Sequence, residues 1–206
     1  MKGEGYMAGG RLDHIRRYIL KNGLKHTAYQ AWLKTKDYYL RSYDRWYHRH
    51  KAAPDELQAQ HLRVFKAPPL ISVVVPVFNT RPEYLSEMAL SVVEQSYPHW
   101  ELCLLDGGSE KPATLAALKE LSRLDKRIRV ERAKENLGIA GNTNLAIDMA
   151  RGAYVALLDH DDTLTPDALY WVADAVEKSG AEVIYSDEDK MQHEGKYLFT
   201  PHLKPD

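Results

Sequence analysis

Short apolar segments alternate with amphipathic ones between residues 70 and 206. Runs of β-branched and aromatic residues without polar alternation predict strands that are covered on both faces of a sheet. The clearest case is Ile71–Phe78, which predicts a central strand, and Tyr154–Leu158 likewise predicts a strand buried on both faces. The five predicted strands are Ile71–Phe78, Trp100–Leu105, Ile128–Glu131, Tyr154–Leu158 and Glu182–Tyr185.

The segments between these strands have the apolar spacing of helices. Leu85, Met88 and Val92, for example, recur three or four residues apart. Pro82 and Pro166 stand where helices would begin, and proline is favoured at the first helical position. Strands that alternate with helices of about ten residues or more form βαβ units with parallel strands. The pattern therefore predicts an α/β fold, a mostly parallel, Rossmann-like sheet flanked by helices.

The residues before this pattern predict a helical N-terminal arm. Asn22-Gly23 separates the first two predicted helices, and Pro68-Pro69 marks the entry into the sheet domain. We therefore expect two parts, a basic, aromatic-rich arm over residues 1–69 and an α/β domain over residues 70–206. The helices predicted in the arm are Arg11–Lys21, Thr27–Lys51 and Asp55–Phe65.

Charge is divided unevenly between the two parts. Residues 1–52 contain 12 Lys and Arg against 4 Asp and Glu, a net charge of +8, whereas the remainder has a net charge of −9. The helix predicted over Thr27–Lys51 also places seven Tyr and Trp residues among its cations. Such a surface suits packing of the arm on its own domain, an anionic membrane surface or nucleic acid. No nucleic-acid motif accompanies it, so we expect no nucleic-acid partner, and the first two alternatives remain open.

The overall composition, 44% hydrophobic and 28% charged, is typical of a globular protein. The sequence contains no run of about 18 apolar residues and no signal-type N-terminus. Cys103 is the only cysteine, which excludes an intrachain disulfide and favours a reducing compartment. Its place in an apolar strand predicts an inert, buried thiol. We expect a cytoplasmic protein, with a peripheral position at the inner face of the membrane as the alternative.

Polar side chains directly follow four of the predicted strands. The densest cluster contains Asp159, Asp161 and Asp162, whose carboxylates repel one another. A divalent cation such as Mg²⁺ or Mn²⁺ would relieve this repulsion, and a solvated acidic turn that caps the next helix is the alternative. Because the carboxyl ends of parallel strands share one edge, the four groups should face one crevice. The other groups are Asn79 and Thr80; Asp106 and Ser109; and Asp187, Glu188 and Asp189.

Neither a G-x-G-x-x-G segment after the first strand nor a G-x-x-x-x-G-K-[ST] segment occurs, which disfavours dinucleotide-binding and P-loop sites. Four segments, over roughly Leu70–Asp206, instead resemble the inverting family 2 glycosyltransferases of the GT-A fold. The resemblance implies metal-dependent, inverting transfer of a hexose or deoxyhexose from a nucleotide-diphospho-sugar to a glycan or lipid-linked acceptor, as in polysaccharide biosynthesis at the cell envelope. The segments are I-S-V-V-V-P-V-F-N, L-L-D-G-G-S, E-N-L-G-I-A-G-N-T-N and Y-V-A-L-L-D-H-D-D.

The same resemblance implies roles for residues at matching positions. Residues at the first two strand ends would contact the nucleotide base, and the D-x-D motif would bind the ribose and, through Mg²⁺ or Mn²⁺, the diphosphate. The metal ligands would be Asp161 and Asp162. The residues implied in nucleotide-sugar binding are Pro76, Phe78, Asn79, Asp106, Asn136, Gly138, Asn144, Asp159 and Asp161.

Two departures from the family pattern bear on function. Asp106-Gly107 stands where paired acids are expected, which leaves base selectivity open. The chain also ends at Asp206, where the resemblance places the start of an acceptor half that carries the catalytic base. We therefore expect a domain that is incomplete at its C-terminus, has exposed apolar surface, and either self-associates or is only marginally stable. The candidates for a base within this chain are Asp187, Glu188 and Asp189.

Three other interpretations differ in their chemistry. A truncated, non-catalytic module would bind a nucleotide sugar or a partner chain without transfer. A nucleotidyltransferase or phosphotransferase would turn over a nucleoside triphosphate. A receiver-like domain would need paired acids after the first strand, where Asn79 and Thr80 stand. The donor sugar, its base, the acceptor and the linkage do not follow from the sequence.

Overall fold

The computed structural model describes the chain except for residues 1–18, 22, 194–196 and 203–206. The chain forms two compact units, one over Ala52–Ile184 and one that joins Met1–Lys51 to Tyr185–Asp206. This division differs from the boundary expected between residues 69 and 70. Residues 52–69 belong to the larger unit, and residues 185–206 belong to the smaller one. The helix predicted over Arg11–Lys21 lies largely outside the described residues.

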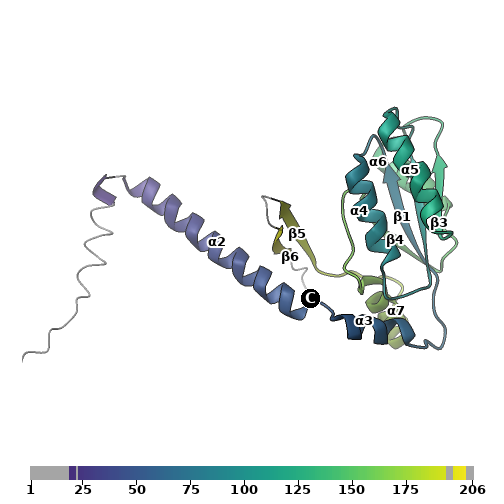
Figure 1. Cartoon of the computed structure of the whole chain (residues 1–206), viewed down its shortest axis with the longest axis horizontal. Helices are drawn as coiled ribbons and strands as arrows, with labels where there is room; N and C mark the ends of the chain where they lie inside the picture. Colours follow the sequence, from purple (N-terminus) through teal and green to yellow (C-terminus); the bar gives the residue numbers. More distant parts are fainter. Residues whose placement is uncertain (1–18, 22, 194–196, 203–206) are drawn as a thin grey trace, which may run out of the picture. The chain divides into compact units, whose positions relative to one another are not determined.

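The larger unit contains a four-stranded sheet in the order β3-β2-β1-β4 (Figure 1). All three strand pairs are parallel, so their carboxyl ends lie along one edge. The α/β class and the parallel sheet are therefore confirmed. The strands are β1 (Ile71–Val77), β2 (Trp100–Asp106), β3 (Ile128–Arg132) and β4 (Tyr154–Leu157).

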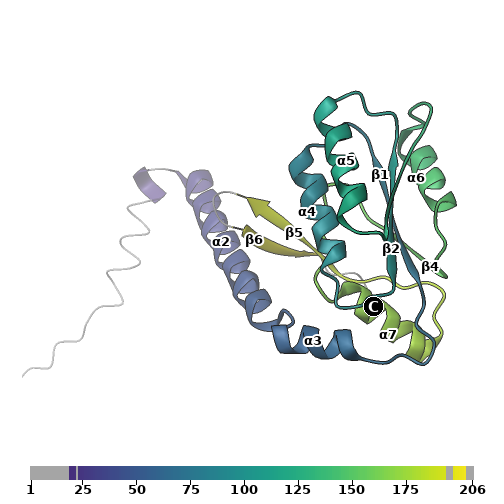
Figure 2. The same cartoon turned by 45° about the vertical axis from the view of Figure 1, so that its right-hand side comes forward.

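Helices cover both faces of this sheet. Figure 2 shows α4 and α5 on one side of the strands and α6 on the other. On the first face, Val73 and Val75 of β1 pack in one core with Leu85 of α4 and Leu118 of α5. The five helices of the unit are α3 (Pro54–Leu62), α4 (Pro82–Val93), α5 (Pro112–Leu124), α6 (Gly138–Asp148) and α7 (Ala168–Ser179).

The opposite face has a smaller core beneath α6. Val74, Cys103 and Leu105 pack there against Ala146 and Met149. Burial raises the pKa of the Cys103 thiol to about 11, which supports the prediction of an inert thiol at neutral pH.

Side chains in and just after α3 attach that helix to the rest of the larger unit. Arg63 donates hydrogen bonds to Asp174 at 2.6 Å and to Glu177 at 2.9 Å, both on α7. Gln60 of α3 accepts a hydrogen bond from the Ser96 hydroxyl at 2.7 Å. These contacts explain why residues 52–69 belong with the sheet.

The prediction that Tyr154–Leu158 is buried on both faces is wrong. Within the described residues β4 pairs with β1 alone, and its side chains alternate between half-buried and exposed. Tyr154 and Ala156 pack against the larger core, whereas Val155 and Leu157 are 42% and 69% exposed. The helix on their face, α6, packs on β1 and β2 instead. The apolar run at residues 154–158 predicted this strand, but the burial of its side chains depends on which elements pack beside it.

The strand predicted over Glu182–Tyr185 is also absent from the described residues. The chain instead forms an antiparallel pair, β5 (Glu188–His193) and β6 (Tyr197–His202), in the smaller unit. The same unit contains α2 (Leu24–His50), which packs against β6. Val183 and Tyr185 of the short apolar segment 182–185 are exposed, because no sheet covers this segment in the described chain.

A buried carboxylate holds the turn that leads into β4. Glu101 of β2 accepts hydrogen bonds from the Ser72 hydroxyl at 2.7 Å and from the backbone N–H of Arg151 at 2.6 Å. The Gly152 backbone N–H donates to the Ser72 hydroxyl at 2.8 Å. A Cβ atom at Gly152 would lie 2.5 Å from the Leu70 carbonyl oxygen, so the close approach of this turn to β1 requires glycine. The network fixes where β4 starts, and hence where the aspartates after it lie.

Candidate functional site

The end of β1 is held by the side chain of Asn79. Its backbone has a left-handed φ of 51°, a conformation that asparagine tolerates better than most residues. Its Oδ1 atom accepts hydrogen bonds from the backbone N–H groups of Glu110 at 2.9 Å and Lys111 at 3.1 Å, just before α5. Asn79 therefore links the ends of β1 and β2, while Phe78 beside it is 43% exposed and Pro76 is half-buried.

The end of β2 contains the buried carboxylate of Asp106, which is 2% exposed. One carboxylate oxygen accepts a hydrogen bond from the Ser109 backbone N–H at 2.8 Å. The other lies 3.6 Å from Nε of Arg132, the last residue of β3. Arg132 in turn donates to the Ser109 carbonyl at 2.9 Å. The Asp106 carboxylate thus lies buried at the end of β2, with one oxygen hydrogen-bonded and the other near a cation.

The loop after β3 is ordered by two asparagine side chains. Asn136 Oδ1 accepts hydrogen bonds from the Gly138 backbone N–H and from Asn142 Nδ2, each at 2.9 Å. Gly138 has a φ of +72°, which favours glycine, and it starts α6. The third residue predicted in this segment, Asn144, is exposed on α6.

The aspartates after β4 form an exposed turn. The Asp162 backbone N–H donates to the Asp159 carbonyl at 3.2 Å, and Nδ1 of His160 lies 3.5 Å from a carboxylate oxygen of Asp161. Across the described residues, no group of three or more His, Cys, Asp or Glu side chains lies close enough to hold a metal ion. Asp161 and Asp162 still offer hard oxygen ligands, and Mg²⁺ commonly takes one or two carboxylates and completes its shell with phosphate oxygens and water. The donor set therefore fits a cation that arrives with a diphosphate.

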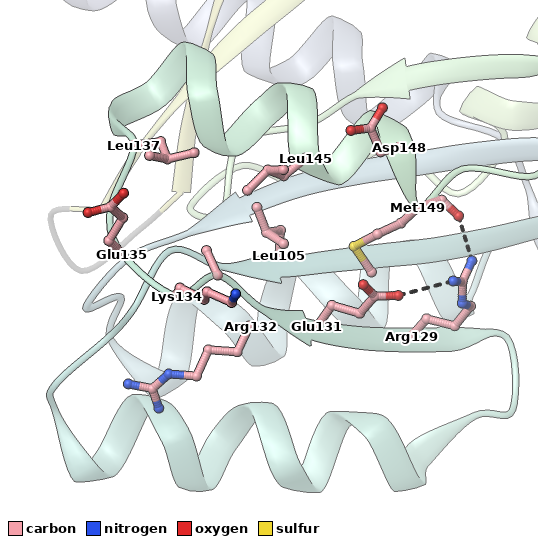
Figure 3. Close-up of a pocket in the computed structure, with 11 residues that line it drawn as sticks. Leu105, Arg129, Glu131, Arg132, Lys134, Glu135, Leu137, Leu145, Asp148 and Met149 are labelled. Carbon is pink, nitrogen blue, oxygen red and sulfur yellow. Dashed lines mark hydrogen bonds and ion pairs between the residues drawn. The ribbon is translucent and has the colours of Figure 1, made fainter.

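A cavity of about 490 Å³ lies between α6 and the strands β2 and β3 (Figure 3). Leu105, Leu145 and Met149 form its apolar wall. Three cations and three acids surround that wall, and Arg129 is already engaged by the Met149 carbonyl at 2.6 Å and by Glu131 at 3.3 Å. The charged residues are Arg129, Glu131, Arg132, Lys134, Glu135 and Asp148. With these signs mixed, the cavity does not indicate an anion site.

The residues considered as catalytic bases lie in the smaller unit. Asp189 accepts a hydrogen bond from the Tyr43 hydroxyl at 3.2 Å, and Glu188 is the neighbouring residue at the start of β5. Burial raises the pKa of Asp189 above its ordinary value, although the hydrogen bond from Tyr43 opposes this shift. Burial and the Asp189 charge together raise the pKa of Tyr43 to about 12. The expectation that Asp187, Glu188 and Asp189 follow a parallel strand is wrong, because the described residues 181–187 form no strand.

Two residues with a structural part in this site were not found from the sequence. Arg132 comes to Asp106 because β3 pairs with β2 in register, Asp106 opposite Arg132. Asn142 fills the space beside Gly107, which lies 35 positions earlier in the sequence. No rule of sequence spacing predicts that Asp106 lies beside Arg132 or that Gly107 lies beside Asn142. The β2–β3 register alone could have been guessed, by aligning the ends of the two predicted strands.

The sequence matches a known family over most of the sheet unit. The model for glycosyl transferase family 2 matches residues 72–197. An uncharacterized protein of Sinorhizobium fredii, y4gI, is 48% identical over 139 residues, which cover 67% of this chain and 15% of that protein. The putative teichuronic acid biosynthesis glycosyltransferase TuaG of Bacillus subtilis is 41% identical over 101 residues, covering 49% of this chain and 39% of its own. The O-antigen biosynthesis protein RfbC of Myxococcus xanthus is 37% identical over 139 residues, covering 67% and 11%.

Solved structures also match, over a little more than half of the chain. Staphylococcus aureus TarS 1–349 in complex with UDP-GlcNAc has 26% identity and a TM-score of 0.49, covering 53% of this chain and 32% of that one. The Pyrobaculum calidifontis mannosyltransferase PcManGT, in complex with GDP-Man and Mn²⁺, has 24% identity and a TM-score of 0.45, covering 57% and 38%. These scores are low, so the assignment depends on the sequence match. The chain spans only 11–39% of the length of the three relatives named above. On the family match over residues 72–197, the chain belongs to glycosyl transferase family 2.

Proposed function

We propose that this chain binds a nucleotide-diphospho-sugar and forms the donor-binding part of an inverting, metal-dependent glycosyltransferase. The observation that carries the proposal is the buried Asp106 carboxylate at the shared carboxyl edge of the sheet, with one oxygen already bonded to the Ser109 N–H. Ligands of open α/β sheets bind outside this edge. In this proposal the second carboxylate oxygen of Asp106 would accept a hydrogen bond from an N–H group of the nucleotide base.

The base would lie between Asp106 and the end of β1, in reach of Pro76 and the exposed ring of Phe78. In this proposal Asn79 acts on the base indirectly, because its side-chain oxygen already accepts two backbone N–H groups. Asn136, Gly138 and Asn144 would border the donor from the loop and helix after β3.

Asp159 would bind the ribose, and Asp161 and Asp162 would hold Mg²⁺ or Mn²⁺ together with the two phosphates. A bound cation would neutralise the charge that develops on the nucleoside diphosphate as it leaves. The carboxylates themselves would hold and orient the cation, and their exposure would leave room for the phosphates.

Inverting transfer also needs a base for the acceptor hydroxyl, since a neutral hydroxyl is a poor nucleophile. Asp187, Glu188 and Asp189 remain the candidates in this chain. The hydrogen bond from Tyr43 to Asp189 favours a structural role for Asp189, because it occupies the carboxylate inside the smaller unit. A donor-binding module without transfer activity is therefore the second candidate function.

We propose a cell-envelope glycan or a lipid-linked precursor as the acceptor, since relatives of this chain are named for teichuronic acid and O-antigen biosynthesis. No helix in the described part of the chain is long and apolar enough to cross a membrane. The basic arm, with Trp32 and Trp46 more than half exposed on α2, supports peripheral binding at the inner face of the membrane.

Calorimetric titration of an Asp161→Ala variant tests the metal part of this proposal. We expect it to lose at least about tenfold in Mn²⁺-dependent nucleotide affinity, because a direct ligand matters no less than the groups that orient one. The matched control is Glu120→Ala, an exposed acid on α5, which should bind like the unaltered chain. Equal affinities of the Asp161→Ala variant and the unaltered chain would refute the assignment of the metal.

A further inference from the structure

The side chain of Asn142 is buried, at 4% exposure, between the loops that follow β2 and β3. Its Oδ1 accepts a hydrogen bond from the Leu137 backbone N–H at 3.2 Å, and its Nδ2 donates to Asn136 Oδ1 at 2.9 Å. The orientation of both amides is determined by their partners, because the N–H groups of Leu137 and Gly138 can only donate. Asn142 thus ties the first turn of α6 to the preceding loop through both ends of its amide.

Gly107 leaves the space that this amide occupies. A Cβ atom at position 107 would lie 2.4 Å from Asn142 Nδ2 and 3.0 Å from its Cγ. The adjacent Gly108 has a φ of +83°, and a Cβ there would lie 3.8 Å from the Asn136 backbone nitrogen. The glycine pair therefore lets the turn after Asp106 approach the loop at residues 136–138 closely.

A side chain at position 107 and the present placement of Asn142 exclude each other. Asn142 has little freedom to move away, because it is buried, helical and bonded at both ends of its amide. This accounts for Asp106-Gly107 at the place where paired acids were expected. An acid at position 107 would collide with the Asn142 amide where it now lies.

We infer that Asn142 is a positioning residue for the nucleotide site, with Gly107 as its structural partner. It holds the loop at residues 136–138 against the Asp106 turn. Among the described residues 104–109 at the end of β2, Asp106 alone supplies a carboxylate. This inference rests on the proposed function for its link to nucleotide binding. The loop-holding role itself concerns the protein without ligand and can be measured separately.

The first arm of the test is amide hydrogen exchange of the full chain without nucleotide. Asn142→Ala should speed exchange at the Leu137 and Gly138 amides roughly tenfold, because it removes one acceptor and frees the other. The control is Thr143→Ala, whose hydroxyl bonds only the Ile139 carbonyl within α6 at 2.8 Å. Exchange at these two amides that stays at the unaltered rate in the Asn142→Ala variant would overturn the inference.

The second arm is calorimetric affinity for UDP, GDP and dTDP with Mn²⁺. Gly107→Ala should weaken the affinity for the nucleotide that the unaltered chain prefers. The double variant Gly107→Ala, Asn142→Ala should lose less affinity than the product of the two single-variant fold losses, since the clash is then removed. Effects that simply multiply would overturn the pairing of these two residues. Should Gly107→Ala fail to fold, recovery of folding in the double variant supports the pairing, and failure of both variants contradicts it.

Asn142→Asp separates positioning from bulk. An ionised carboxylate accepts from Leu137 but cannot donate to Asn136, whereas a protonated one can. Loop protection in this variant should therefore increase as the pH falls through the titration of the introduced carboxyl group, a trend absent from the unaltered chain. A pH-independent difference would contradict the role of the donated hydrogen bond. If the unaltered chain binds no nucleotide, the proposed function fails, while the exchange measurements still decide whether Asn142 holds the loop.

Discussion

Replacement of Glu101 by alanine should destabilise the sheet unit substantially. The carboxylate is buried, at 7% exposure, and accepts from the Ser72 hydroxyl and the Arg151 backbone N–H. Without it, the Arg151 N–H loses this acceptor, and the Ser72 hydroxyl must find another. Leaving a buried donor unsatisfied costs about 1–3 kcal/mol, and water that enters the space left by the side chain offsets part of this. We expect a loss of about 2–4 kcal/mol in the free energy of unfolding at pH 7.

The charge of Glu101 contributes separately from its hydrogen-bonding oxygen. Glu101→Gln keeps an acceptor for Arg151 but loses the ion pair with Arg129, in which Nη1 lies 3.4 Å from the carboxylate. Because Arg129 is a quarter exposed, we expect this variant to lose only about 1 kcal/mol.

The contribution of Glu101 should depend on pH with a definite sign. Burial by itself would raise the pKa of Glu101, but the hydrogen bonds from Ser72, Arg151 and Arg129 outweigh it and lower the pKa below its ordinary value. A lowered pKa in the folded state stabilises the fold above the pKa of the unfolded chain, about 4.3, and this contribution is lost as the pH falls further. The stability difference between the unaltered chain and Glu101→Gln should therefore narrow below about pH 4.3.

Thermal unfolding followed by circular dichroism at several pH values measures both effects. At about 2–4 °C per kcal/mol, Glu101→Ala should lower the midpoint by roughly 5–15 °C at pH 7. Glu120→Gln on α5, which is exposed, serves as the control and should unfold like the unaltered chain. A Glu101→Ala midpoint within about two degrees of the unaltered one would refute the reasoning, as would a Glu101→Gln difference that is constant with pH.

Two further predictions concern exposed surfaces. Leu157 is 69% exposed on the strand at the edge of the described sheet and should promote self-association. Leu157→Lys should therefore lower the average mass measured by light scattering, whereas Val64→Lys at another exposed site should leave it unchanged. A monomeric unaltered chain would contradict this prediction. The positive charge of residues 1–52 should support salt-sensitive binding to anionic vesicles. Replacing Lys25, Arg49 and Lys51 by glutamate changes the net charge of residues 1–52 from +8 to +2. This variant should co-sediment with the vesicles about tenfold more weakly, or weaker still. Equal sedimentation of the two proteins would argue against a membrane-binding arm.

The strands and the direction of the sheet followed from local patterns. Ile71–Phe78 and Trp100–Leu105 were predicted within a residue of β1 and β2, because these segments are dense in β-branched and apolar residues, which fit the covered surface of a sheet. The helix boundaries near Pro82 and Pro166 were similarly local, since proline restricts its own backbone; α4 begins at Pro82, and α7 begins two residues after Pro166.

Features that depend on distant neighbours could not be predicted in this way. Leu157 is exposed because α6 packs on other strands, and Val183 lies outside any strand because no partner strand lies beside it in the described chain. At the site, Asp106 was predicted from its place after a strand. The contact of Gly107 with Asn142 joins residues from two loops, so it required the fold.

The most direct test of the central proposal is calorimetric titration of the unaltered chain with UDP, GDP and dTDP, each with and without Mn²⁺. If Asp106 binds a base and the aspartates after β4 hold a cation with the diphosphate, one of these nucleotides should bind, and its affinity should fall when Mn²⁺ is removed. Absence of binding by all three nucleotides in the presence of Mn²⁺ would contradict the donor-binding function.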